Sequence, residues 1–171
     1  MKELLDKLSS YNVFNYLLPG ILFAYLVDSI SSYILLQTDI VIGLFLYYFL
    51  GLIISRIGSL LVEPFLKMIR FVKFAPYADF VAACKSDPKI ELLSEANNMY
   101  RTFCAMLLLL GVIKSYDCLS QNYPILTTLA PYVSIAALLV LFLFSYKKQT
   151  EYIQHRVTAN SQKSKPSDKR R

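Results

Sequence analysis

Residues 39–62 read DIVIGLFLYYFLGLIISRIGSLLV, an apolar run long enough to cross a lipid bilayer as one helix. The hydrocarbon core of a bilayer is about 30 Å thick, so a spanning helix needs roughly 20 apolar residues. Three further runs of the same character lie at 14–36, 100–119 and 125–146. The sequence therefore predicts an all-α, polytopic membrane protein with four transmembrane helices.

The links between these runs predict how the helices pair. Only Gln37 and Thr38 separate the first two runs, and a link that short forces a tight antiparallel hairpin. The polar segment 120–124, SQNYP, makes a second hairpin from the last two runs. Residues 63–99 lie between the hairpins and mix aromatic, aliphatic and basic side chains with prolines. We expect this segment to be a helical cytoplasmic loop.

Charge is distributed unevenly around the four runs. If all four cross the bilayer, every one of the 18 Lys and Arg residues except Lys114 falls on the same side. Basic residues are strongly enriched in the cytoplasmic segments of membrane proteins. We therefore expect a multi-pass protein with its N- and C-termini in the cytoplasm.

The two ends of the chain have their own character. Residues 1–13 predict a short amphipathic helix on the inner membrane surface. Residues 147–171 form a basic tail that we expect to be largely disordered, although its first half is able to extend the last span as a helix. Such a tail attracts anionic lipids, at about 1 kcal/mol per charge. We do not expect nucleic-acid binding, because no folded surface presents these charges.

Five of the ionisable residues within or beside the predicted spans are candidates for a functional or structural role, because a charge there costs about 2.5–3.5 kcal/mol on insertion scales. Asp28 and Lys114 lie near the outer ends of their spans. A pair between them would be either part of an ion path or a structural contact. Arg56, Glu63 and Arg101 lie near the inner ends, and we expect a network that joins the second and third spans.

Small residues follow one face of the second predicted span. Gly51, Ser55 and Ser59 are spaced four apart, and Gly58 is adjacent. Small residues at this spacing let two helix backbones approach closely in a membrane. The pattern fits packing within the bundle as well as packing between subunits.

A row of polar side chains leads into the third predicted span. Glu95, Asn98 and Arg101 are three apart and therefore share one face of a helix. Polar residues aligned at the membrane surface predict a docking surface for a cytoplasmic partner. Interfacial capping of the helix is the alternative interpretation.

Motifs of catalysis and cofactor binding are missing from the sequence. It contains no glycine-rich phosphate loop, no HExxH motif and no nucleophile elbow. Its single histidine, His155, lies in the polar tail without a fixed partner. We therefore predict no catalytic residue, no cofactor and no metal site, and we do not expect an enzyme.

Two segments carry a resemblance. They are YNVFNYLLPGILF at 11–23, and FAPYADF at 74–80 followed by DPKIELLSEANNMYRT at 87–102. Both resemble parts of small four-helix bacterial inner-membrane proteins, some of which are encoded beside CRISPR or other anti-phage defence genes. The resemblance implies an inner-membrane location and a membrane-acting role in a defence system. It carries no catalytic residues over.

These observations predict a non-enzymatic integral membrane protein. We expect it to self-associate as a homo-oligomer and to couple a cytoplasmic protein partner or cue to the membrane, as an effector or a pore. Two alternatives stay open. One is a small ion or solute channel or transporter subunit that works through Asp28 and Lys114. The other is a passive membrane scaffold.

Overall fold

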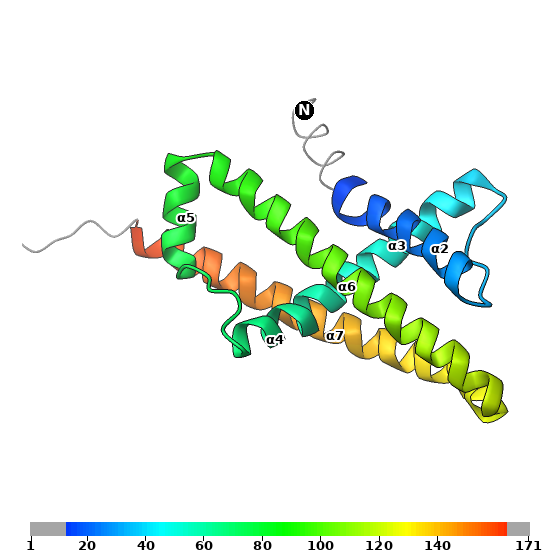
Figure 1. Cartoon of the computed structure of the whole chain (residues 1–171). Coiled ribbons are helices and arrows are strands. Elements are labelled where there is room, and N and C mark those ends of the chain that lie inside the picture. Colours follow the sequence, from blue (N-terminus) through cyan, green and yellow to red (C-terminus); the bar gives the residue numbers. More distant parts are fainter. Residues whose placement is uncertain (1–12, 164–171) are drawn as a thin grey trace, which may run out of the picture.

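The computed structural model describes residues 13–163, and every regular element in that range is helical (Figure 1). The all-α class predicted from the sequence is confirmed for this range. Residues 1–12 of the predicted amphipathic segment and residues 164–171 of the tail lie outside the described residues. In chain order the elements are η1 (Val13–Leu17), α2 (Leu18–Ile30), α3 (Ile40–Ile57), η2 (Gly58–Val62), α4 (Glu63–Met68), α5 (Tyr77–Ser86), α6 (Lys89–Asn122) and α7 (Pro124–Lys163).

Three of the described helices are long and apolar enough to cross a membrane. The first, Ile40–Met68, is continuous through α3, η2 and α4; the second is α6; and the third covers Pro124–Ala159 of α7. The run at 14–36 behaves differently, because its apolar helix covers only Asn15–Ile30. The structure therefore shows a helical protein with three long candidate spans and one shorter apolar helix.

The first predicted span is shortened because α2 ends at Ile30. Ser31 Oγ donates to the Val27 carbonyl oxygen (2.8 Å), and the chain leaves the helix at that point. Downstream, the Asp28 carboxylate accepts backbone N–H bonds from Leu35 (2.6 Å) and Leu36 (3.3 Å). These bonds give the irregular backbone the partners that it loses outside the helix, and an unpaired backbone group costs several kcal/mol in a hydrocarbon environment.

A second carboxylate starts the next helix. Asp39 is the N-cap of α3 and accepts from the backbone N–H groups of Val41 (2.8 Å) and Ile42 (3.0 Å). The Tyr47 hydroxyl accepts from the Gln37 N–H (2.9 Å) and so holds the connection against α3. The connection between the first two helices therefore runs over residues 31–39, and the predicted link Gln37–Thr38 is only part of it.

The backbones of η1, α2 and α3 touch at two glycines. A Cβ atom on Gly20 would overlap the carbonyl oxygen of Tyr47, and one on Gly51 would overlap the carbonyl oxygen of Tyr16. Both obstacles are backbone atoms, so neither clash is relieved by a side-chain rotation. The small-residue face predicted on the second span thus packs helices inside one chain at Gly51.

The buried apolar core involves α2, α3, η2 and α6. Helix α7 stays outside it: no residue in its apolar window is buried within the described chain. It contacts the remainder through a stacked Phe49–Phe142 pair, with ring centroids 6.2 Å apart, and through the Tyr116 hydroxyl, which donates to the Leu126 carbonyl oxygen (2.8 Å). The core residues are Phe23, Val27, Ile54, Val62, Ala105, Met106 and Leu110.

Helix α4 ends in a well-defined stop. Arg70 has a φ of 60°, in the left-handed region. Its N–H donates to the Lys67 carbonyl oxygen (3.0 Å), and the Phe71 N–H donates to the Leu66 carbonyl oxygen (2.9 Å). This is the hydrogen-bond pattern of a Schellman motif, which usually has glycine where this chain has Arg70. The stop separates α4 from the segment that leads to α5.

The predicted loop 63–99 is divided among three helices. It contains α4, a non-helical stretch, α5 and the first turns of α6. The Asp87 carboxylate accepts from the Lys89 N–H (2.9 Å), and α6 then continues without interruption into the predicted third span. Figure 1 shows α6 and α7 diverging from their shared turn, with α5 between their separated ends.

Helix α7 is longer than the predicted span 125–146. It continues into the basic tail as far as Lys163. The expectation that the first half of the tail extends the last span as a helix is confirmed. Because α6 and α7 both extend well beyond their apolar runs, the two helices and α5 together enclose a space beyond the apolar part of the bundle.

Candidate functional site

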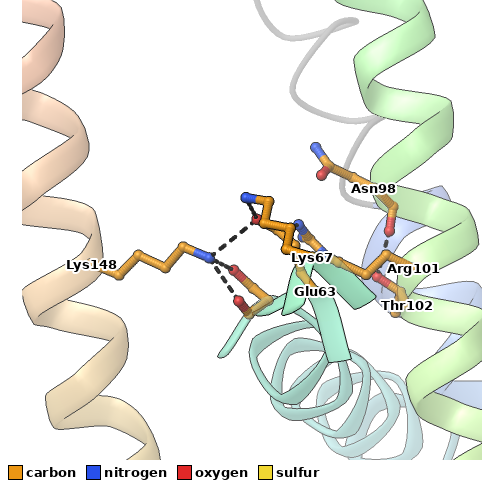
Figure 2. A network of polar contacts seen from close by, with 7 residues as sticks. Glu63, Lys67, Asn98, Arg101, Thr102 and Lys148 are labelled. Carbon is orange, nitrogen blue, oxygen red and sulfur yellow. Dashed lines mark hydrogen bonds and ion pairs between the residues drawn. The ribbon is translucent and has the colours of Figure 1, made fainter. Parts of the chain in front are cut away.

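A buried carboxylate lies where the three long helices meet α5. Glu63, whose side chain is 8% exposed, accepts from Lys67 Nζ (2.7 Å) one turn along α4 and from Arg101 of α6 (2.5 Å). Lys148 Nζ of α7 lies 3.8 Å from the same carboxylate. Figure 2 shows Glu63 between Lys148 on one side and Arg101 on the other. We call this region the charged end of the bundle.

The π-helical turn η2 supplies two of the oxygen atoms that bind α7. The Glu63 N–H bonds to the Gly58 carbonyl oxygen, so the local hydrogen-bond register differs from that of an α-helix. Within this turn, the carbonyl oxygen and the hydroxyl of Ser59 both accept from Lys148 Nζ (2.7 and 2.8 Å). Short π turns within α-helices occur frequently at functional sites. The lysine thus fixes α7 to η2 and α4 through three oxygen atoms.

A cavity of about 690 Å³ lies beside Glu63. Its walls come from the inner part of the Ile40–Met68 helix, from α5, from the beginning of α6 and from the end of α7. Ligand sites in proteins commonly have volumes of about 300–1,000 Å³. The cavity is therefore large enough for a small organic molecule, and every long helix of the described chain contributes to it.

Basic groups outnumber acidic groups around the cavity. Arg56, Lys67, Arg101 and Arg156 line it, and Glu63 is the single acidic residue among the described lining residues. The Nε atom of Arg101 is buried and has no hydrogen-bond partner within residues 13–163. A buried donor without an acceptor costs roughly 1–3 kcal/mol. The cavity thus has surplus positive charge.

Aromatic rings form much of the remaining wall. Tyr77 of α5 packs edge-to-face against Tyr152 of α7, with ring centroids 5.8 Å apart, and lies 6.2 Å from the ring of His155. The Lys67 ammonium lies 4.2 Å from the centroid of the Phe74 ring, within the range of a cation–π contact. These contacts hold α5 against the end of α7 and close one side of the cavity.

The structure brings together two of the three residues predicted for the inner network and places the third nearby. Glu63 and Arg101 form the ion pair that the sequence predicts. Arg56 lines the same cavity, but it forms no ion pair with Glu63 in the described part of the chain. Lys67 and Lys148 complete the network and were missed. The i, i+4 spacing of Lys67 from Glu63 was a usable signal, whereas no local pattern pointed to Lys148.

Two of the three residues of the predicted docking face on α6 line the cavity. These are Asn98 and Arg101, whereas Glu95 is not among the lining residues. Ser94 and Asn97 occupy the wall instead. These four residues have the i, i+3, i+4 and i+7 spacing of one helical face. The polar face of α6 therefore points into the cavity between the helices.

Three of the small residues of the second predicted span line the cavity or lie next to it. Ser55 and Ser59 are buried and line the cavity. A Cβ on Gly58 would lie 3.2 Å from the Arg101 carbonyl oxygen, so this glycine lets α6 approach closely enough for Arg101 to reach Glu63. The face is an intramolecular packing surface in this structure.

At the opposite end of the bundle, the predicted Asp28–Lys114 pair is wrong. Asp28 bonds to the backbone of the connection after α2, and Lys114 lies 3.9 Å from Asp117 on its own helix. Asp117 is 3% exposed and accepts from both the hydroxyl and the N–H of Ser32. Asp117 is not among the residues predicted for this end, although an acid three residues after a lysine in an apolar helix is a usable signal.

The comparisons with known proteins identify no relative of this chain. No protein-family model matches the chain, and neither the curated proteins nor the solved structures give a significant match. Fold and site together describe an all-helical protein, with helices long and apolar enough to span a membrane and a basic cavity at one end.

Proposed function

We propose that this chain is a non-enzymatic, multi-pass membrane protein that converts a cytoplasmic cue into a change in the packing of its membrane helices. The contact set of Glu63 carries the proposal. One buried carboxylate on α4 binds Arg101 of α6 and lies next to Lys148 of α7, at the wall of a cavity that all three helices share. A cue that enters this cavity acts on both of these contacts at once.

The proposed orientation places the charged end in the cytoplasm. The distribution of Lys and Arg supports it, because basic residues collect on the cytoplasmic side. We further propose that the chain crosses the membrane four times, with η1 and α2 as part of the first crossing. Their backbone contact with α3 at Gly20 and Gly51 supports this, because it keeps the first helix within the bundle.

The topology is tested with an N-terminal tag and two native cysteines. Cys84 lies in α5, and Cys118 is exposed near the opposite end of α6. In sealed vesicles we expect a membrane-impermeant maleimide to label a Cys84-only variant from the cytoplasmic side and a Cys118-only variant from the other side. We expect the tag on the side of Cys84. A tag on the side of Cys118 would show three crossings instead of four.

We propose a bacterial inner membrane as the location and a defence system as the context. Support comes from the resemblance of segments 11–23, 74–80 and 87–102 alone. Self-association also stays a prediction, because lipid solvates the exposed apolar face of α7 as well as a second copy would. The transporter alternative has lost its supporting contact, since Asp28 and Lys114 each have another partner.

The coupling is tested by releasing α7. Lys148→Met removes the ammonium that bonds to Ser59 and approaches Glu63. We expect the distance between spin labels at Met68 of α4 and Thr150 of α7, measured by pulsed EPR in lipid nanodiscs, to become longer and more broadly distributed. The labels replace exposed residues, in a background without the native cysteines.

Lys147→Met is the matched control for this experiment. Lys147 is exposed, directly precedes Lys148 and does not line the large cavity. It should leave the distance distribution unchanged. If Lys148→Met gives the same distribution as wild type, the charged end does not control the position of α7 and the proposed coupling fails.

A further inference from the structure

We propose that the cavity at the charged end binds a phosphate group, carried either by an anionic lipid headgroup or by a small soluble phosphoester. The inference rests on the proposed function, because it names the chemistry of the cue. Three features of the cavity support it. They are its net positive charge, the arginine side chains that line it, and the aromatic and amide side chains in the rest of its wall.

The net positive charge of the cavity favours a bound anion. Four basic side chains line the cavity against the single carboxylate of Glu63, and Lys148 adds a fifth cation next to that carboxylate. Charges close to a low-dielectric interior repel one another more strongly than in water. A doubly charged anion would remove most of this repulsion, whereas a neutral ligand would leave it in place.

The arginines supply donors in the geometry that phosphate requires. Arg101 lines the cavity and uses Nη1 for Glu63. Arg56 and Arg156 line the cavity without an ion pair to any described acidic residue. The planar fork of guanidinium groups pairs with two oxygen atoms of a phosphate at once. These groups are therefore poised for phosphate.

The remaining wall fits the organic part of a phosphoester. Tyr77, Phe80 and Tyr152 present aromatic rings, and Asn97 and Asn98 present amides. A volume of about 690 Å³ exceeds what a lone inorganic ion needs. A headgroup with part of its glycerol backbone and a nucleoside monophosphate both combine a phosphate with an organic part of suitable size.

The Glu63 carboxylate would compete with a bound phosphate for the same basic side chains. It accepts from Arg101 and Lys67 and lies next to Lys148. A phosphate bound to Arg101 would share or replace this carboxylate as the acceptor. Because Arg101 and Lys148 share this carboxylate, a phosphate that binds Arg101 would change the ionic contacts through which Glu63 links α6 and α7.

Two binding assays separate the sources of the phosphate. In the first, native mass spectrometry counts phosphatidylglycerol molecules retained by the protein after release from mixed phosphatidylcholine–phosphatidylglycerol nanodiscs. In the second, calorimetry in phosphatidylcholine nanodiscs titrates adenosine monophosphate, with inorganic phosphate as the competitor. Retention of phosphatidylglycerol indicates a lipid source, and saturable binding of the nucleotide indicates a soluble one.

Arg56→Gln and Arg156→Gln test the site in either assay. We expect each to weaken binding about tenfold, since each removes a charge-assisted hydrogen-bond donor. Lys73→Gln is the matched control, because Lys73 is exposed between α4 and α5 and does not line the cavity. It should bind like wild type. Size-exclusion profiles report whether each variant folds, and competition by inorganic phosphate in wild type is informative without any variant.

The proposal is overturned if wild type retains no phosphatidylglycerol and binds no nucleotide. It is also overturned if Lys73→Gln weakens binding as much as the cavity variants. Either of these two results, together with a changed Met68–Thr150 distance in Lys148→Met, would reject phosphate binding and leave the coupling proposal standing. An unchanged distance together with specific binding would reject the coupling and leave the site.

Discussion

Replacement of Gly51 by alanine is expected to separate the first helix from α3. The added methyl group would overlap the Tyr16 carbonyl oxygen, a backbone atom with no rotamer to change. The two helices have to move apart, and the packing around Phe23 and Ile54 in the core moves with them. Overpacking of a close contact costs about 1–3 kcal/mol, and we expect the upper end here because backbone has to shift.

The measurement is thermal stability in detergent, followed as the loss of the monodisperse size-exclusion peak after heating. At about 2–4 °C per kcal/mol for a chain of this size, the midpoint should fall by roughly 6–12 °C. Gly20→Ala should behave similarly, because its methyl group meets the Tyr47 carbonyl oxygen.

Gly111→Ala is the internal control for this pair. A Cβ at Gly111 meets no atom within 4 Å, and the residue lies within α6. Alanine is the better helix former, by about 0.8–1 kcal/mol in soluble hosts, so this variant should match or exceed wild-type stability. Equal midpoints for Gly51→Ala and Gly111→Ala would show that the helices do not touch at Gly51.

Replacement of Glu63 by glutamine is expected to have the second large effect. It leaves Arg101 and Lys148 near one another without the carboxylate between them. Breaking a buried ion pair by removing one partner costs about 3–5 kcal/mol, because the remaining charge stays desolvated and uncompensated. We expect a lower thermal midpoint and poor yield of monodisperse protein.

A double variant distinguishes loss of the pair from damage to the backbone. In Glu63→Gln combined with Lys148→Met, one of the uncompensated cations is absent, so the destabilisation should be smaller than the sum of the two single effects. Glu91→Gln, an exposed carboxylate at the start of α6, should be neutral. Additive effects in the double variant would contradict direct coupling between Glu63 and Lys148.

The membrane character and the helical class could be predicted because they depend on composition summed over long windows. The run 125–146 lies entirely inside α7, and the run 100–119 lies inside α6. The first run was harder. Residues 33–36 are as apolar as the helix before them, and hydropathy does not record that Asp28 bonds to the backbone of Leu35 and Leu36.

The candidate site could be predicted where its partners were close in sequence or shared a helix end. Arg101 and Glu63 were recognised because each is an ionisable residue at the edge of a long apolar run. Lys148 directly follows Lys147, which is solvent-exposed, and differs from it because α7 crosses η2 where Lys148 Nζ reaches the Ser59 carbonyl oxygen. Such tertiary contacts leave no periodic signal in a single sequence.

The peripheral position of α7 has a consequence for biosynthesis. The ribosome completes α2, α3 and α6 before it reaches Pro124, so the residues that form the buried core have all been made while the last helix is still being translated. During that interval Glu63 has Lys67 and Arg101 but lacks Lys148. Arrival of the last helix then adds the contacts of Lys148 with Ser59 and with the Glu63 carboxylate, so these contacts are the last at the charged end of the bundle to form.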